Sequence, residues 1–446
     1  MNEKPIVTTD TVCNPELLAF PAVKKRRVTA SFTGGDVTSD GGLPLLRQVD
    51  RRLGLTQAIA AALPDPRDPA LVEHSQLTLV RQRIFGLCHG YEDLNDHDTL
   101  RHDPAWQTAI EQVKPLASSP TLCRLENRAD RAAAVALHRI FVDQFIASCR
   151  TPPTELILDF DATDDRVHGR QAGAHFHGYY GDYCFLPLYV FCGEQRLVAY
   201  LRPGDSDAAR HAGAILKLLV QRLRSAWPQV KIIFRGDSGF CRRRVLHWCE
   251  RHDVHYLVGL AQNARLLAAA QPLRQQAEKT FAAKQEKQRH FGDLQYAAGT
   301  WRHARRVIVK AEHTAKGSNP RFLVTNLPGD AQKLYDEVYC ARGEMEHRIK
   351  EQQLGLFADR TSCHGWWANQ FRLLLSSFAY VLLERLRTLG LAGTELARAQ
   401  AGTIRLKLLK LGAVVLRNTR RIQLLLSSSH PYQRLFGQVA RARGSG

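Results

Sequence analysis

The sequence predicts an α/β protein whose central sheet is flanked on both sides by helical regions. Within residues 151–262, short apolar runs typical of buried strands alternate with helix-periodic segments. Residues 1–150, and again the chain from 336 onward, are instead dominated by helical periodicity. Residues 263–335 interrupt this order with further strand-like runs. We therefore expect a sheet domain that carries a β-rich insertion and lies between helical N- and C-terminal regions.

The N-terminal region, residues 1–150, is expected to begin as an arm carrying the basic run KKRR at residues 24–27. The glycine-rich stretch GGDVTSDGG lacks the Lys-Ser/Thr of a phosphate-binding loop, so we interpret it as a turn before a helix. Further along, Ser119 and Pro120 have the residue types of an N-cap and a first helical position. The region as a whole is predicted to be mainly helical.

The predicted sheet begins with the apolar run LILDFDAT, Leu156–Thr163. Two strand-like runs joined by a turn follow it, CFLPLYVF and RLVAYL, and then a helix with leucines at helical spacing. The strand VKIIFRG, a helix over Arg242–Arg251 and a strand over Val254–Leu260 complete the block. Three strands, helix, strand, helix, strand is the element order of a ribonuclease-H-like sheet. We expect this fold for residues 151–262.

Beyond the sheet, the runs HFGDLQY, ARRVIVKAEH and RFLVTNL predict antiparallel strands within the insertion, residues 263–335. Residues 336–390 are expected to return to the core with a long charged helix that carries Glu346 and an apolar helix that begins near Trp366. From Trp366 to the end there are thirteen Lys/Arg against two Glu. Residues 391–446 are therefore predicted to form a basic helical region.

The charge and the apolar content of the chain indicate what kind of partner the protein binds. The formal net charge of +19 favours a polyanion, and nucleic acid is the commonest one; an anionic membrane surface is the rival. The sequence has no run of 18 apolar residues, and MNEKPIVTTD lacks the apolar core of a secretion signal, so we expect a cytoplasmic protein. The ten cysteines include no CxxC pair and are expected to be reduced thiols.

The first strand carries two carboxylates that need a counter-charge. Asp159 and Asp161 alternate with apolar residues and share one face of the strand. Burying two like charges is costly unless a basic side chain or a divalent cation neutralises them. A salt-bridged strand end is the simpler interpretation of this segment alone. For Asp159, which lies one pleat deeper, we expect an arginine partner rather than a metal ion.

Three acidic residues on separate elements form a candidate site. Asp161 lies near the end of the first strand, Asp237 at the end of a later strand, and Glu346 on a helix beyond the insertion. Two aspartates from adjacent strands and a glutamate from a helix meet the needs of a phosphodiester site with two metal ions about 3.5–4 Å apart. Mg²⁺ prefers such hard oxygen ligands, and Mn²⁺ can substitute for it.

Each candidate has a simpler structural interpretation. Asp237 could cap the following helix, and Glu346 could form a surface ion pair with Lys350 one turn later. A zinc site is a further alternative, built from histidines in the turn after the first strand, namely His168, His175 and His177.

Several strings along most of the chain resemble one family, the DDE transposases of bacterial insertion sequences. They are LDFDATDD, HGYYGDYCFLPLY, RGDSGFCR and DRTSCHGWWANQFRLLLSSFAYVLL. One branch of that family has a β-rich insertion before its glutamate and a Tyr-x2-Arg-x3-Glu-x6-Lys signature. Tyr339, Arg342 and Glu346 have these spacings, whereas Gln353 stands where the lysine is expected.

The resemblance implies that Asp161, Asp237 and Glu346 are the catalytic metal ligands. It also implies that Tyr339 and Arg342 contact the transposon end near the cleaved phosphate. Gln353 would remove one phosphate contact, and Lys350, one turn earlier, would supply a substitute.

The resulting hypothesis is a Mg²⁺-dependent transposase of the bacterial cytoplasm, associated with the nucleoid. It would bind the terminal inverted repeats of its insertion sequence, nick each end and join the freed 3′ hydroxyl to target DNA. A homodimer is expected because two ends must meet in one complex, and the regions 1–150 and 391–446 would hold the repeats. Two alternatives stay open: a metal-dependent nuclease of the same fold that does not join strands, and a non-catalytic DNA-binding protein.

Overall fold

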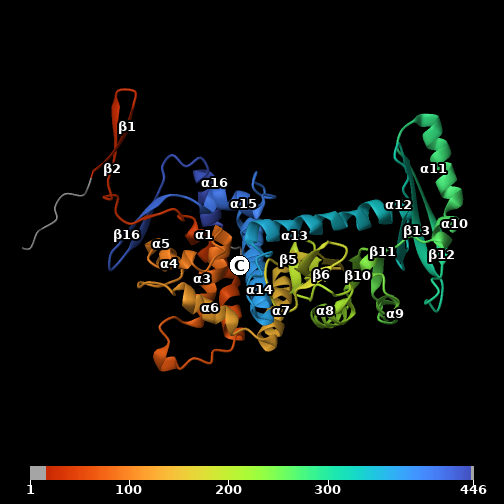
Figure 1. Cartoon of the computed structure of the whole chain (residues 1–446), viewed down its shortest axis with the longest axis horizontal. Helices are drawn as coiled ribbons and strands as arrows, with labels where there is room; N and C mark the ends of the chain where they lie inside the picture. Colours follow the sequence, from red (N-terminus) through yellow and green to blue (C-terminus); the bar gives the residue numbers. More distant parts are fainter. Residues whose placement is uncertain (1–16, 443–446) are drawn as a thin grey trace, which may run out of the picture.

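The structure, a computed structural model, describes residues 17–442. The molecule is elongated, with the helical N- and C-terminal regions at one end and the outermost strands of a large sheet at the other (Figure 1). The mixed α/β class predicted from the sequence is confirmed. Within the described residues, none of the helices combines the length and apolarity that a membrane crossing requires.

A nine-stranded mixed sheet forms the centre of the fold, in the order β12-β13-β15-β11-β10-β4-β8-β9 with β14 paired to β13. Its middle strands β4, β10 and β11 are parallel, and β8 and β9 continue from β4 in antiparallel pairing. These five strands are the ones predicted for residues 151–262. Their bounds are Glu155–Ala162 (β4), Leu188–Cys192 (β8), Gln195–Tyr200 (β9), Lys231–Gly236 (β10) and His255–Leu260 (β11).

Alternation along the strands divides the sheet into two buried faces. On one face, Leu158, Phe160 and Phe234 pack with the apolar sides of helices α8 (Ala212–Ala226) and α9 (Arg243–Arg251). On the other face, residues such as Ile233 pack against the helical segment that leads to Glu346. The acidic residues of β4 point toward this second face, because they alternate with Leu158 and Phe160.

The predicted strands of the insertion are present but do not form a separate unit. β15 pairs with β11 antiparallel, β13 pairs with β15, and β12 pairs with β13, so the insertion widens the main sheet. Helix α11 packs on its outer strands (Figure 1). The bounds are Ala264–Ala269 (α10), Gln271–Lys284 (α11), Gln288–Tyr296 (β12), Arg305–Thr314 (β13), Gly317–Ser318 (β14) and Arg321–Thr325 (β15).

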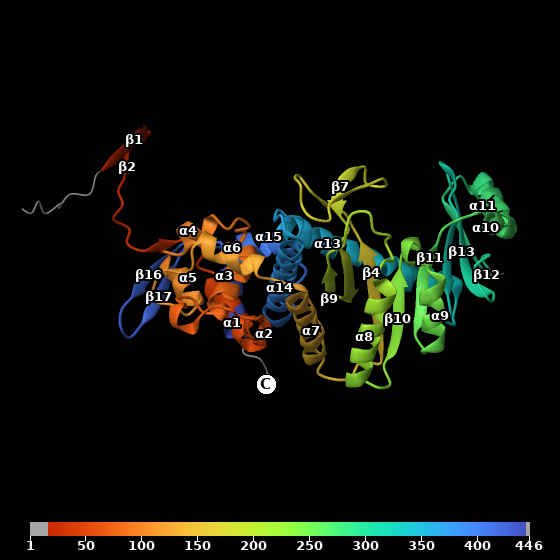
Figure 2. The ribbon, with the colours of Figure 1, turned by 60° about the horizontal axis from the view of Figure 1, so that its bottom comes forward.

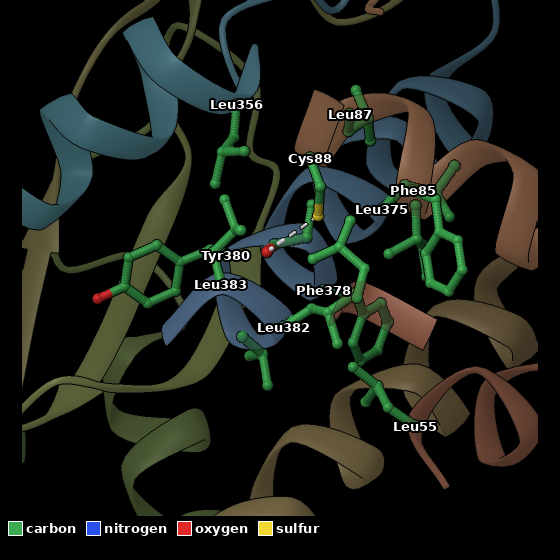
Figure 3. Close-up of a cluster of buried hydrophobic side chains, with 14 of the residues drawn as sticks. Leu55, Phe85, Leu87, Cys88, Leu356, Leu375, Phe378, Tyr380, Leu382 and Leu383 are labelled. Carbon is green, nitrogen blue, oxygen red and sulfur yellow. Dashed lines mark hydrogen bonds between the residues drawn. The ribbon is translucent and has the colours of Figure 1, made fainter. Parts of the chain in front are cut away.

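The N-terminal helices and the long helix α14 (Trp366–Gly390) share one hydrophobic core. Phe141 of α7 stacks on Phe378 of α14 with ring centroids 4.1 Å apart. In Figure 3, Leu55 and Phe85 approach α14 from the N-terminal helices, and Cys88 Sγ lies 3.6 Å from the Ala379 carbonyl oxygen. The main helices are Leu43–Leu53 (α1), Leu55–Ala62 (α2), Gln76–His89 (α3), Asp96–Leu100 (α4), Pro104–Ala109 (α5), Ser119–Asn127 (α6) and Arg131–Ser148 (α7).

Helix α6 begins one residue earlier than predicted. Ser118, with an extended backbone, is its N-cap, while Ser119 and Pro120 are its first two helical residues. Proline is tolerated at both positions, because the first N–H groups of a helix have no partner within it.

The terminal regions contain strands that helical periodicity did not reveal. Residues 1–16 of the expected arm lie outside the described residues, and the rest of it forms a hairpin of β1 (Leu18–Val23) and β2 (Arg26–Ala30). Lys24 and Lys25 of the KKRR run form its turn, and Arg26 and Arg27 begin β2. The prediction of a purely helical C-terminal region is wrong. β16 (Ala413–Arg417) and β17 (Ile422–Leu426) form a hairpin whose turn is fixed by Asn418, and β16 also pairs with β3 (Val37–Thr38). The remaining elements are α15 (Ala401–Ile404), a π-helical turn (Arg405–Leu409) and α16 (Gln433–Arg441).

Candidate active site

Asp161 and Asp237 lie at the same edge of the sheet. Phe160 of β4 is paired with Gly236 of the parallel strand β10. The residues that follow this pair, Asp161 and Asp237, therefore lie next to each other at the carboxyl ends of the two strands. Asp161 is the penultimate residue of β4, and Asp237 follows β10 directly. The adjacency expected from the sequence is therefore present in the structure.

Asp237 also caps the short 3-10 turn Ser238–Phe240. Its Oδ1 accepts a hydrogen bond of 2.8 Å from the backbone N–H of Gly239. The capping interpretation is thus correct, but it uses one carboxylate oxygen and leaves the other free for a further ligand. Gly259 of β11 permits the close packing here, because a Cβ at this position would lie 2.7 Å from the Ser238 nitrogen and 3.0 Å from the Tyr339 hydroxyl.

Glu346 lies in the first turn of α13 (Gly343–Leu356), at the end of a helical segment that starts with α12 (Ala331–Lys333). Between them, a π-helical turn (Leu334–Tyr339) and a 3-10 turn (Cys340–Arg342) carry the other residues of the signature. In Figure 1 this segment runs from the insertion back to α14. It therefore crosses the sheet and brings residues from beyond the insertion to the edge at which Asp161 and Asp237 lie.

Buried polar contacts fix α13 against α14. Gln352 is fully buried, and its side-chain amide donates to the hydroxyls of Ser376 and Ser377 at 3.1 and 2.9 Å. Glu351 accepts a hydrogen bond of 3.0 Å from Arg387. Because these groups lie little more than one helical turn after Glu346, they set the position of the helix that carries it.

Arg342 joins two of the three candidate carboxylates. Its Nη1 lies 3.3 Å from Oδ2 of Asp161, and its Nη2 lies 2.6 Å from Oε1 of Glu346. In the simpler interpretation Glu346 would pair with Lys350, but the ion pair that the structure shows joins it to Arg342, one turn before the glutamate rather than one turn after it. Lys350 is exposed on the same helix.

The electrostatics link all three carboxylates. Burial raises the pKa of Asp161 to about 7; the Arg342 guanidinium opposes this rise, and the charges of Asp237 and Glu346 add to it. Burial likewise raises the pKa of Tyr339, with Arg342 opposing and Asp237 adding to the shift. The site is thus an acidic cluster with one arginine in its midst and a tyrosine at its side.

Asp159 has the arginine partner expected from the sequence. Arg235, on the neighbouring strand β10, contacts both of its carboxylate oxygens, with Nη2 2.6 Å from Oδ2. Arg235 also donates to the carbonyl oxygen of Val338. The Asp159–Arg235 pair therefore fastens the helical segment to the sheet.

Gln353 makes a contact that the sequence did not suggest. Its side-chain amide donates a hydrogen bond of 3.1 Å to the carbonyl oxygen of Asp164, in the turn after β4. The residue that replaces the signature lysine thus holds the chain just beyond Asp161. No sequence signal predicts this contact, because it depends on how α13 lies over the turn.

A zinc site among the histidines is not supported. His177 Nδ1 accepts a hydrogen bond from the backbone of Tyr179 at 3.3 Å. Within residues 17–442, no three His, Cys, Asp or Glu side chains lie close enough together to hold a metal ion, and this includes Asp161, Asp237 and Glu346 as they stand. For the acidic cluster, the hard oxygen donors fit Mg²⁺ or Mn²⁺, but Arg342 lies between Asp161 and Glu346 and would have to leave them.

A family model described as "Transposase DDE domain group 1" matches residues 20–443. The chain belongs to this family of DDE transposases. The family recognised from the sequence motifs is therefore confirmed, and with it the prediction of a transposition enzyme. DDE transposases in general use divalent metal ions.

Structural comparison finds a cryo-EM structure of the piggyBac transposase synaptic complex with hairpin DNA. The similarity has a TM-score of 0.40 at 10% sequence identity, over 83% of this chain and 79% of that chain. No curated protein matches the sequence.

Proposed function

We propose that this DDE transposase cuts and joins DNA at the ends of its own insertion sequence, with Asp161, Asp237 and Glu346 as its catalytic residues. The observation that carries the proposal is that Arg342 contacts both Asp161 and Glu346 at the sheet edge where Asp237 emerges. The strand order β9-β8-β4-β10-β11 supports a ribonuclease-H-like core in residues 151–262, interrupted by the insertion 263–335 and completed by residues 336–390.

The three carboxylates would hold Mg²⁺ or Mn²⁺. When bound, such ions lower the pKa of the attacking water or hydroxyl and stabilise the leaving 3′ oxygen. Asp161 and Asp237 would hold the ions from the sheet, and Glu346 would hold them from α13. Buried polar contacts to α14 fix the position of the helix that carries Glu346.

Arg342, Tyr339 and Lys350 would bind the DNA strand beside the cleaved phosphate. Arg342 would have to leave Asp161 and Glu346 for metal ions to bind there, and its guanidinium could then make a two-pronged contact to a phosphate. The Tyr339 hydroxyl lies beside the turn that begins at Asp237, within reach of the same phosphate. Lys350 is exposed one turn after Glu346 and adds a positive charge along the strand.

The helical N-terminal region, residues 1–150, and the basic C-terminal region, residues 391–446, would hold the terminal inverted repeats. The net charge of +19 supports a DNA partner, because the phosphate backbone dominates the affinity of such proteins. Joining two ends in one event calls for a homodimer. A bacterial cytoplasmic protein associated with the nucleoid would meet its substrate directly.

The test compares Asp237→Asn with the parent protein on end-containing duplex DNA and a target plasmid in Mg²⁺. Asp143→Asn, in an exposed ion pair with Arg222, is the matched control. We expect Asp237→Asn to bind the ends but to give neither nicked nor joined product, and Asp143→Asn to behave like the parent. Cleavage retained by Asp237→Asn would refute the site. Cleavage without joining by the parent would favour the nuclease alternative, and binding without cleavage the non-catalytic one.

A further inference from the structure

A second, small sheet rises from the catalytic edge. Its order is β5-β7-β6, with bounds Asp165–Arg166 (β5), His175–His177 (β6) and Asp182–Phe185 (β7). β5 begins four residues after Asp161, and it pairs with β7 through Asp165 and Phe185. Figure 2 shows β7 and the loops around it projecting from the main sheet. The chain that carries the first catalytic aspartate therefore continues directly into this projection.

The base of the projection is held firmly. The ring of Phe185 packs edge-on against Trp366 of α14, with centroids 5.5 Å apart. The backbone N–H of Ala172 donates to the His364 carbonyl oxygen at 3.1 Å, and Thr361 donates to the buried carboxylate of Asp165 at 2.9 Å. These contacts with the chain just before α14 and with its first residue keep the small sheet in a fixed position relative to the active site.

The tip of the projection, in contrast, presents aromatic rings to solvent. We call residues 175–185 the aromatic hairpin. Tyr179 is 87% exposed, Tyr183 58% and Phe176 55%. Phe176 and Tyr183 are cross-strand partners whose rings lie 5.8 Å apart, and the Tyr179 and Tyr180 rings lie 5.0 Å apart. Exposed aromatic clusters of this kind mark binding surfaces.

The aromatic hairpin also reaches back toward the acidic cluster. Tyr180, at its tip, is half-buried, and after burial itself the largest influences on its pKa are the carboxylates of Asp164 and Asp161, which raise it. The Asp164 carbonyl is the group that Gln353 holds. Tyr180 therefore stands near the carboxylates at which a DNA strand would be cut, and the Tyr179 ring lies next to it at the tip.

We propose that the aromatic hairpin binds unpaired nucleotides next to the cleaved phosphate by stacking their bases on Tyr179, Phe176 and Tyr183. This inference rests on the proposed function. Aromatic rings bind a base only when it has left the duplex stack, so the occupant is single-stranded or flipped-out DNA rather than intact duplex. Arg170, exposed on the same projection, supplies positive charge for its backbone, whereas Arg166 is exposed but lies 3.6 Å from Asp164 and 3.7 Å from Asp182.

The experiment uses the full chain with Asp237→Asn in EDTA, so that no strand is cut during binding. Two DNA ends are compared: a blunt duplex, and the same duplex with a short unpaired stretch at its end. Tyr179→Ala, and separately Phe176→Ala with Tyr183→Ala, should weaken binding to the unpaired end by about 5-fold to 100-fold, the range that base stacking on one ring supplies. Binding to the blunt duplex should change by less than about 2-fold, because its bases stay stacked.

Two further variants sharpen the test. Tyr179→Trp should keep the affinity for the unpaired end, since a larger ring still stacks. Leu218→Ala removes a side chain that is 66% exposed on α8, outside the regions assigned to DNA, so it should leave both affinities unchanged. Equal losses on both ends, or no loss, would overturn the inference. A changed oligomeric state in light scattering with unchanged binding would instead assign the hairpin to a protein interface. If the Asp237→Asn protein bound neither end, the proposed function itself would fail.

Discussion

The guanidinium of Arg342 lies 3.3 Å from Oδ2 of Asp161, although the two residues are 181 positions apart. The same guanidinium contacts Glu346, which lies in the first turn of α13 directly after Arg342. Arg342 thus supplies the counter-charge that the buried Asp161 requires.

Arg342 should therefore compete with metal ions for the site. We expect Arg342→Ala to bind Mn²⁺ more tightly than the parent at pH 8 without DNA, by roughly 5-fold, since one ion-pair contact of about 1 kcal/mol no longer has to be broken. The same variant should cleave DNA ends more slowly, because its phosphate contact is gone. Calorimetric titration measures the affinity. Arg348→Ala, which removes an arginine paired with Glu194, is the control; weaker Mn²⁺ binding by Arg342→Ala alone would contradict this view.

Asp165 should make the stability of the protein depend on pH. Burial raises its pKa to about 8, the Thr361 hydroxyl opposes the rise, and the charges of Asp359 and Asp164 add to it. Between about pH 4 and pH 8 the native state therefore holds a proton at Asp165 that the unfolded state has lost. Its contribution to stability is present at low pH and is lost as the pH rises through this window.

In Asp165→Asn the side chain at this position is uncharged at every pH. The variant should therefore not lose stability as the pH rises. At pH 8 the variant should be more stable than the parent by on the order of a few kcal/mol, and at pH 4 about as stable. Thermal melting across this range measures the difference. Parallel profiles for the two proteins would show that Asp165 does not titrate in this window.

Asp159 and Arg235 should behave as one structural unit. Arg235→Met leaves a buried carboxylate without its partner and should destabilise the protein by about 3–5 kcal/mol. Replacing both residues, with Asp159→Leu added, should recover much of that loss. Denaturant unfolding measures the stabilities, and strictly additive effects of the two substitutions would contradict a direct pair.

Lys350 should contribute one phosphate contact. Lys350→Ala is expected to weaken DNA-end binding and to reduce the slope of log affinity against log salt by about 1. Lys231→Ala is the matched control, since Lys231 begins β10 and pairs with Glu155 at the opposite edge of the sheet. If the slope fell equally for both variants, the effect would come from net charge rather than from a contact at the site.

Sequence periodicity was sufficient to predict the strands of the core, because β4 and β10 are apolar runs ended by acidic or glycine residues. The arginine partner of Asp159 followed from the cost of burying a carboxylate. The hairpin β16–β17 was not predicted, because its short strands lie beside helices in a leucine-rich segment. Over so few residues, the apolar pattern fits the period of a helix as well as that of a strand.

The contacts of Arg342 and Gln353 could not be predicted from spacing alone. The family signature places both residues on the helical segment with Glu346, but which oxygens they reach depends on the path of that segment across the sheet. The Val338 carbonyl held by Arg235, and Gln352 buried against α14, fix this path through tertiary packing. Such contacts cannot be predicted from the local sequence.

The central claim is that Asp161, Asp237 and Glu346 act together on divalent cations. The most direct measurement is a crystal structure of the protein soaked in Mn²⁺, with the metal located by its anomalous signal. The account predicts a peak coordinated by oxygens of Asp161 and Asp237, with Arg342 withdrawn and Glu346 at the same centre. Manganese bound elsewhere, with Arg342 still joined to both carboxylates, would contradict it.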